Sequence, residues 1–331
     1  MTVKEWMEFA LYDKERGYYA TRLGSLPDYV TAPTFGPFLG EAIASELIRA
    51  WRTLPKNLHP EVFSVVEAGC GADGNLSAAI VGVIRNQEPV LYDRLQVLLV
   101  DRSLPRLDSA VSRLSGLFEN KVFGCPDITQ IPKVWGAIIS NELLDAFAVR
   151  LIRRTAGEEV QEGYVAGGDS RAIEWRKCSD PVVVSFGLDL PLNTAYALNL
   201  DALKFFEAVR DRLDHGLILT VDFGDLRPMI FERSALKAFS NRTVRNLTLG
   251  AAGSEDLTSP VDFSLLMDCG MRLGLETLHF ETLGSFLIRN GIADKMAPAG
   301  GIAALKDNLK IKTLIHPYGF GEDFKVLIQG K

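Results

Sequence analysis

Three closely spaced glycines are the first residues in the sequence with a spacing that suits ligand binding. Gly69, Gly71 and Gly74 lie in the stretch VVEAGCGADGNL, between an apolar run and a helical pattern. Glycines at such a turn keep the backbone free of side chains, so that a ligand can approach it closely. The G-x-G-x-x-G spacing is typical of a dinucleotide site, but a tight strand-to-helix turn without a ligand has the same pattern.

Two carboxylates distinguish between the ligands that such a turn can bind. Asp101 ends the next apolar run, where an acid can accept hydrogen bonds from the ribose diol of either NAD or S-adenosylmethionine (SAM). Glu67 precedes Gly69 by two positions. Its carboxylate would repel the pyrophosphate of NAD, whereas it suits the cationic methionine end of SAM. We therefore expect SAM, and we keep a nicotinamide-dependent oxidoreductase and a turn without a ligand as alternatives.

These residues must be positioned by a sheet that brings the ends of several strands together. Short apolar runs alternate with helical patterns, which predicts an α/β fold with a mostly parallel, doubly wound sheet and a ligand site at the carboxyl ends of its strands. We expect two further strands from the runs GLETLHF and DFKVLIQ near the C-terminus, one of them antiparallel. The other expected strands lie within residues 61–69, 94–103, 121–128, 135–140 and 215–225, and the helices span about 75–85, 107–118 and 203–213.

Two regions interrupt this alternation. Residues 148–190 contain the short runs AVRLIRR, EEVQEGYVA, AIEWRKC and PVVVSF, separated by Gly and Pro, which predict inserted antiparallel strands. Residues 225–260 are polar with irregularly spaced apolar positions, which predicts a long functional loop or a small helical insert. We expect residues 1–60 to form an N-terminal helical segment or lid, and residues 61–331 to form the core with these two insertions.

Composition excludes several classes of protein. The 331-residue chain has 36 Lys and Arg against 42 Asp and Glu, a net charge of -6, so a nucleic-acid partner is not expected. The four Cys and four His are scattered, so we expect no metal site and a reducing compartment. No apolar run reaches the roughly 18 residues of a membrane span, and the acidic N-terminal segment is unlike a targeting peptide. These features predict a cytoplasmic protein.

Six separated motifs give the sequence a family resemblance. In chain order they read MEFALYDKERGYYATR, DYVTAPTFGPFLGEAIASEL, NELLDAFAV, LTVDFG, EDLTSPVDFSLL and GFGEDFKVLI. Together they resemble the MidA/NDUFAF7 family of class I SAM-dependent methyltransferases, which is linked to the assembly of mitochondrial complex I. The resemblance implies a Rossmann-like methyltransferase core, SAM as the cofactor and a protein arginine as the methyl acceptor. The implied partner is a protein substrate such as a subunit of the respiratory NADH dehydrogenase.

The resemblance assigns cofactor contacts to the ends of the first four strands. At the position of the family's third glycine this chain has Asp73, and its own third glycine comes one residue later, at Gly74. This difference implies an inserted residue or a reshaped turn. Asp127 can accept a hydrogen bond from the adenine amino group, although a simple turn aspartate after Pro126 is an alternative. The full set of cofactor candidates is Glu67, Gly69, Cys70, Gly71, Gly74, Asp101, Arg102, Asp127, Ile128 and Asn141.

The acceptor side is assigned to the segment NELLDA, with Asn141, Glu142 and Asp145, and to Asp28. Carboxylates bind the planar guanidinium in a bidentate manner and can orient one nitrogen toward a sulfonium. If the segment begins a helical turn, Glu142 and Asp145 can face the same side. The alternative is a simple helix start, capped by Asn141 and with acids favoured by the helix dipole.

Some positions depart from the family pattern. Pro27 replaces a glycine, Thr34 a glutamate and Gly36 a serine, and no histidine occurs within residues 225–260. These changes concern the loop that would cover the cofactor and the acceptor. They keep open a second function, a SAM-binding but catalytically weak or silent assembly factor.

Overall fold

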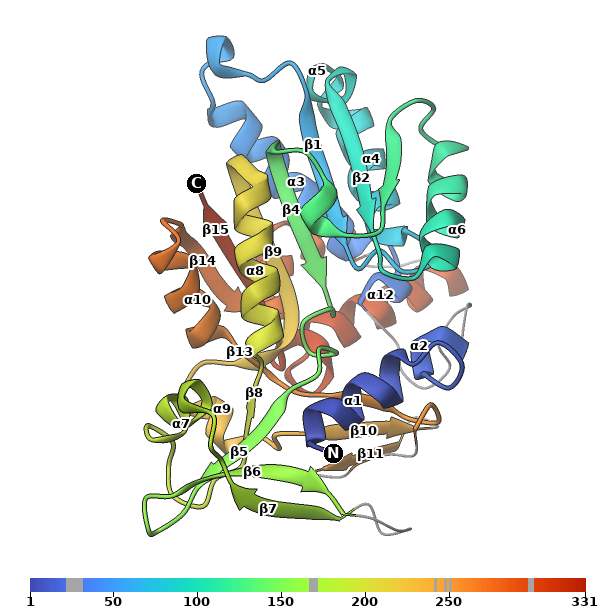
Figure 1. The fold of residues 1–331 in the computed structure, drawn as a ribbon. Coiled ribbons are helices and arrows are strands. Elements are labelled where there is room, and N and C mark those ends of the chain that lie inside the picture. Colours follow the sequence, from blue (N-terminus) through green and yellow to red (C-terminus); the bar gives the residue numbers. More distant parts are fainter. Residues whose placement is uncertain (22–31, 167–171, 241–242, 247–248, 250–251, 297–300) are drawn as a thin grey trace. The chain divides into compact units, whose positions relative to one another are not determined.

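The computed structural model describes the chain except for residues 22–31, 167–171, 241–242, 247–248, 250–251 and 297–300 (Figure 1). The chain divides into two compact units. Unit 1 comprises Met1–Tyr29, Leu143–Phe206 and Phe223–Leu266, and unit 2 comprises Val30–Glu142, Glu207–Asp222 and Met267–Lys331.

Unit 2 is built on a mostly parallel sheet. Strand β1 is parallel to β2 and β4, β2 is parallel to β3, and β4 is parallel to β9. All six residues of β1 are buried, as expected for a central parallel strand covered on both faces. The strand order is β14 (Glu276–Thr282), β15 (Phe324–Gly330), β9 (Leu213–Asp225), β4 (Val134–Asn141), β1 (Phe63–Ala68), β2 (Leu95–Val100) and β3 (Val122–Cys125).

The C-terminal strands reverse direction. β14 and β15 form an antiparallel pair. Gly216 of β9 and Lys331 exchange both backbone hydrogen bonds, which is the antiparallel pattern, so β15 runs against β9. The expected parallel neighbours β1 and β2, and the antiparallel strand near the C-terminus, are therefore confirmed.

The helices of unit 2 enclose one large apolar core with the sheet (Figure 1). Helix α4 packs closely on α3, because Gly40 has no side chain and a Cβ there would meet the Ala79 Cβ at 2.5 Å. The helices are α3 (Phe38–Thr53), α4 (Asn75–Gln87), α5 (Pro89–Asp93), α6 (Leu104–Ser115), α11 (Leu283–Arg289) and α12 (Ile302–Ile315). Two more, α8 (Leu200–Arg212) and α10 (Phe263–Arg272), contain the boundary between the units.

Unit 1 contains two small antiparallel sheets. The first has the order β7 (Ile173–Lys177), β6 (Val160–Val165), β5 (Arg150–Arg154) and β8 (Tyr196–Leu198), which confirms the inserted antiparallel strands. The second has the order β11 (Thr243–Asn246), β10 (Lys237–Ser240) and β12 (Asp256–Thr258). Unit 1 also holds the helices α1 (Val3–Tyr12), α2 (Tyr18–Thr21), α7 (Pro181–Gly187) and α9 (Met229–Glu232), and β13 (Val261–Asp262) pairs with the last residues of β9.

Two expectations for this part of the chain were wrong. The run PVVVSF is helix α7 and not a strand, because the Asp180 side chain accepts the backbone N–H groups of Val182 and Val183 and Pro181 occupies the first turn. Residues 225–260 are neither a long loop nor a mainly helical insert. They hold the short helix α9 and the sheet of β10, β11 and β12, in which the irregular apolar positions Ala238 and Leu257 are buried in a core with α1.

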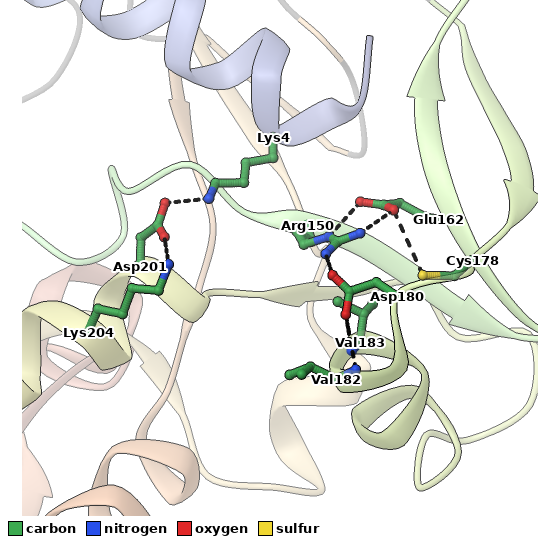
Figure 2. A network of polar contacts seen from close by, with 9 residues as sticks. All are labelled: Lys4, Arg150, Glu162, Cys178, Asp180, Val182, Val183, Asp201 and Lys204. Carbon is green, nitrogen blue, oxygen red and sulfur yellow. Dashed lines mark hydrogen bonds and ion pairs between the residues drawn. The ribbon is translucent and has the colours of Figure 1, made fainter.

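A partly buried arginine connects β5, β6 and α7 in unit 1. Figure 2 shows Arg150 contacting two carboxylates, with Nε and Nη2 donating to Glu162 at 2.7 and 2.6 Å and Nη1 donating to Asp180. The same Asp180 caps α7, and Cys178 Sγ lies 3.9 Å from Glu162 Oε2. This network explains why a charged residue can lie in a mostly apolar part of the sheet, since each charge is paired and hydrogen-bonded.

Candidate active site

The carboxyl ends of four neighbouring strands meet at one edge of the unit 2 sheet. Ala68 of β1 pairs with Val100 of β2 and with Ser140 of β4, and Val100 pairs with Cys125 of β3. The chain goes from β1 to β2 and β3 on one side and returns to place β4 on the other side of β1. Ligands bind in doubly wound sheets at this change of direction, between β4 and β1.

The glycine loop follows β1. Gly69, Gly71 and Gly74 all have left-handed backbones, with φ of +75°, +64° and +55°. A Cβ on Gly71 would meet no atom within 4 Å, whereas a Cβ on Gly74 would lie 2.9 Å from Leu114. Gly71 therefore presents open backbone, while Gly74 allows the start of α4 to approach α6. The turn around Asp73 is thus shaped by three left-handed glycines, the last of which directly precedes α4.

Asp101 is held by the backbone on both of its oxygens. Oδ2 accepts the N–H of Gly71 at 3.0 Å, and Oδ1 accepts the N–H of Ser103 at 2.8 Å. A carboxylate oxygen can accept more than one hydrogen bond, so both retain capacity for a ribose hydroxyl. The structure thus brings Asp101 to the glycine loop as expected, and its contact with a ribose stays a prediction.

Glu67 lies deeper, at the end of β1. It is buried, and its Oε2 accepts hydrogen bonds from the Ser77 N–H at 3.1 Å and the Ser77 hydroxyl at 2.5 Å. Burial raises the pKa of the Glu67 carboxyl to about 7; the bonds from Ser77 oppose this shift, and the Asp101 charge adds to it. A buried carboxyl that ionises so reluctantly is stabilised in its charged form by a nearby cation.

The remaining cofactor candidates lie along the same edge. Asp127 is exposed and caps the short helix Ile128–Gln130, since its Oδ1 accepts the Thr129 N–H at 2.8 Å, which is the geometry of a turn aspartate. Ile128 and Cys70 are buried, and Arg102 is exposed. Burial raises the pKa of the Cys70 thiol, so it stays protonated at neutral pH. Roles for these four side chains in cofactor binding stay predictions.

The end of β4 does not form the expected helical turn. Glu142 has a left-handed backbone with φ of +48°, which is incompatible with a right-handed helix. No helix begins in residues 141–149, so both the helical turn that would align Glu142 with Asp145 and the alternative of a helix capped by Asn141 are wrong. Such an uncommon conformation in a non-glycine residue marks positions that the surrounding structure holds in place.

The Glu142 carboxylate connects two segments of unit 2. Its Oε1 accepts the backbone N–H of Ala32 at 2.9 Å and the side-chain amide of Asn141 at 3.2 Å. Because that carboxylate can only accept, the Asn141 side chain must turn its nitrogen toward it. The other atom of the amide, Oδ1, is buried and has no hydrogen-bond partner in the part of the chain that the structure describes.

The segment Ala32–Phe35 forms a short 3-10 helix, η1, before α3. Phe35 packs edge-on against Phe320 of the C-terminal GFGEDF motif, with ring centroids 5.3 Å apart, so the N- and C-terminal motifs of unit 2 meet here. Gly36 has φ of +141°, and a Cβ there would meet the Phe38 ring at 3.0 Å. The serine that the family has at this position would therefore be strained in this backbone.

Two acceptor-side candidates lie outside the described part of unit 2. Asp28 and the altered Pro27 lie outside the described residues. Asp145 belongs to unit 1, where its backbone carbonyl accepts the N–H of Ser259 at 2.9 Å. Sequence reasoning also missed two groups that hold the site together, Ser77 and the Ala32 amide. Ser77 is an alcohol in the first turn of the helix that follows the glycine loop, which was a usable signal, whereas a backbone amide leaves no signal in the sequence.

No helix among the described residues is long and apolar enough to cross a membrane. No group of three or more His, Cys, Asp or Glu residues in the same part of the chain could hold a metal ion.

Comparisons with known proteins agree on one family. A family model described as "Putative S-adenosyl-L-methionine-dependent methyltransferase" matches residues 42–281. The mitochondrial protein arginine methyltransferase NDUFAF7 homolog of Drosophila melanogaster is 24% identical over 295 residues, and the Homo sapiens protein is 22% identical over 293. Both alignments cover 80% of this chain but only 65% and 64% of the relatives, so the chain spans slightly less than two thirds of their length.

Solved structures show the same fold. Two crystal structures of proteins from Burkholderia thailandensis match with TM-scores of 0.85 and 0.83, at 22% and 23% identity. The matches cover 100% of this chain and 88% and 87% of those chains, and the first of those proteins is bound to S-adenosyl-homocysteine. The expected Rossmann-like class I core is therefore confirmed.

Proposed function

The chain belongs to the family of S-adenosyl-L-methionine-dependent methyltransferases, and from that premise we propose that it transfers a methyl group to an arginine guanidinium of a protein acceptor. The family gives SAM as the cofactor. The arginine acceptor is supported by the names of the NDUFAF7 relatives and by the carboxylate at the end of β4.

The residues at the sheet edge fit SAM. The buried, unpartnered Oδ1 of Asn141 is an acceptor that lacks a donor, and the amino group of a methionine moiety would supply one. Gly71 leaves open backbone beside it in the neighbouring loop, and Asp101 offers acceptor capacity for a diol. Glu67 supplies the charge that a cationic ligand stabilises. A pyrophosphate would meet the two carboxylates Glu67 and Asp101 with unfavourable charge, which argues against a nicotinamide cofactor.

The protein's part in the reaction is mainly to position groups. SAM supplies an already activated sulfonium methyl group when it is bound. Asn141, Glu67 and Asp101 would hold its two ends at the β1–β4 edge, and Glu142 would hold the acceptor guanidinium and orient one nitrogen. Alignment of two reacting groups accounts for a large part of the rate in such transfers, so no further catalytic group is required.

Glu142 is the observation that carries the arginine assignment. Its left-handed backbone and the bonds from Ala32 and Asn141 fix the carboxylate at the edge of the sheet before an acceptor binds. A carboxylate fixed in this way matches the planar, bidentate geometry of a guanidinium.

The test compares methyl transfer by wild type, Glu142→Gln and Glu142→Ala, with labelled SAM and arginine-containing subunits of the respiratory NADH dehydrogenase as candidate acceptors. Glu142→Gln keeps an oxygen for the Ala32 amide but loses the charge that binds a guanidinium. We expect it to bind SAM normally and to lose transfer by about a hundredfold. Glu119→Gln, an exposed glutamate between α6 and β3, is the matched control and should behave as wild type.

Other outcomes decide against the proposal. Equal transfer by wild type and Glu142→Gln, with a loss only in Glu142→Ala, would make Glu142 a residue that holds η1 and not one that binds the acceptor. SAM binding without transfer to any arginine acceptor would favour the second candidate, a silent assembly factor. Two observations support that candidate. Thr34, in η1, replaces the glutamate of the family, and Gly36, just after η1, has a backbone that would strain the family's serine.

A further inference from the structure

Helix α12 exposes an apolar stripe. Ile302, Leu305 and Leu309 are 74%, 58% and 64% exposed, although Ile311 and Leu314 on the opposite side of the same helix are buried in the core. Residues three, four and seven apart lie on one side of a helix, so the three exposed side chains form a continuous strip about two turns long. Single exposed apolar residues are ordinary, but a continuous strip marks a contact surface.

Two lysines flank this stripe. Lys306 follows Leu305 on one side of the strip, and Lys312 lies three residues beyond Leu309 on the other side. Both are exposed, and neither has an ion-pair partner among the residues that the structure describes. Lys310, by contrast, pairs with Asp307 at 3.0 Å. The stripe therefore carries positive edges in a chain whose net charge is -6.

The helix that carries the stripe packs against η1 within unit 2. The Ala32 amide at the start of η1 binds the Glu142 carboxylate. Phe35 of η1 also contacts Phe320, which follows α12 in the sequence. A protein bound along α12 would thus be separated by one element, η1, from the carboxylate that we assign to the acceptor arginine.

We propose that the stripe of α12 docks the acceptor protein, through an amphipathic helical segment of that protein with an apolar face bordered by Asp or Glu. This inference rests on the proposed function, because it extends the same acceptor site. Apolar contact would supply the affinity, and the carboxylates would pair with Lys306 and Lys312 to fix the orientation. An anionic membrane surface is the less favoured occupant, because the net charge of -6 would repel it and the stripe has only three apolar side chains.

The test measures binding of a short, designed amphipathic helical peptide with leucines on one face and glutamates on both borders, by fluorescence anisotropy. A peptide with lysines in place of the glutamates is the comparison. We expect the Glu-bordered peptide to bind more tightly, and Leu305→Glu/Leu309→Glu to weaken it by about tenfold or more. Lys306→Glu/Lys312→Glu should reverse the preference between the two peptides. Met271→Glu, at a residue 69% exposed on α10, is the matched control and should change nothing.

Several results would overturn the inference. Equal binding of both peptides, no binding, or an equal effect of Met271→Glu would show that the stripe has no such specificity. Binding of vesicles of phosphatidylcholine and phosphatidylglycerol that Leu305→Glu/Leu309→Glu abolishes, without peptide binding, would assign the stripe to a membrane. A dimer in sedimentation that the same variant dissociates would assign it to a second copy. Peptide binding needs no methyl transfer, so a failed transfer assay with normal peptide binding contradicts the proposed function alone.

Discussion

The buried carboxyl of Glu67 should make SAM affinity depend on pH. Burial raises its pKa to about 7, so without a ligand the carboxyl is mostly protonated at pH 6 and mostly ionised at pH 8. The proposed cationic ligand favours the ionised form. If only that form binds, the affinity should rise about tenfold between pH 6 and pH 8, in proportion to the ionised fraction.

The same pKa predicts an opposite effect on the stability of the free protein. The folded pKa lies above the ordinary glutamate value of 4.5, so the protonated carboxyl is the form that folding favours. This contribution is complete below about 4.5 and is lost as the pH rises through about 7. A shift of this size corresponds to about 3 kcal/mol of unfolding free energy. Glu67→Gln should therefore lose less stability than wild type between pH 5 and pH 8.

Calorimetric titration with SAM and with S-adenosylhomocysteine measures both the affinity and the protons released on binding. Wild type should release protons near pH 7, and Glu67→Gln should release fewer, so the contribution of the ligand's own amino group is removed by subtraction. S-adenosylhomocysteine lacks the sulfonium charge and should show the weaker dependence. An identical pH profile in wild type and Glu67→Gln would refute the reasoning, because the carboxyl would then not sense the ligand.

Three other positions give separate predictions. Asp101→Ala should weaken SAM binding by about 1–3 kcal/mol in calorimetry, the scale of a hydrogen bond to a charged group, and unchanged affinity in a folded variant would remove Asp101 from the site. Gly71→Val should abolish SAM binding, because a branched side chain would strain a φ of +64° and fill the open backbone; normal binding would show that no ligand approaches there. Arg150→Ala should lower unfolding free energy by about 3–5 kcal/mol in denaturant titration, since it leaves Glu162 buried without its partner, whereas the exposed Arg176→Ala should have little effect.

The central sheet could be predicted from the sequence because its strands are buried on both faces. Such strands are continuous apolar runs, and β1 and β2 match their expected ranges within three residues. Glycines and acids at the ends of those runs are equally local signals, so the residues at the sheet edge could be named before the structure was known. The alternation of strands and helices implies a parallel sheet, and in a parallel sheet the residues that follow neighbouring strands lie at the same edge.

The errors arose where two local signals disagreed. In PVVVSF the β-branched valines favour a strand, but Asp180 and Pro181 are strong signals for the start of a helix, and they decided the structure of α7. Strand β8 was missed because three residues, Tyr196–Leu198, are too few for a periodic pattern. In NELLDA the polar residues suggested a helix start. Instead, the Glu142 N–H donates to the carbonyl of the distant Val221 and its carboxylate accepts the N–H of Ala32, and these bonds hold Glu142 in a left-handed conformation. No local pattern contains that information.

The three carboxylates that we expect to bind the cofactor or the acceptor also accept hydrogen bonds from the protein's own backbone. Asp101 accepts the Gly71 and Ser103 amides, Glu67 accepts Ser77, and Glu142 accepts Ala32. Each carboxylate is therefore oriented before a cofactor or an acceptor arrives, so binding need not order it again. Asn141 differs from them, because its Oδ1 is buried without a donor, and a buried acceptor without a donor destabilises the protein. Its persistence is understandable if a ligand satisfies it, which makes Asn141 the most specific indication that this edge of the sheet is built to bind an amino group.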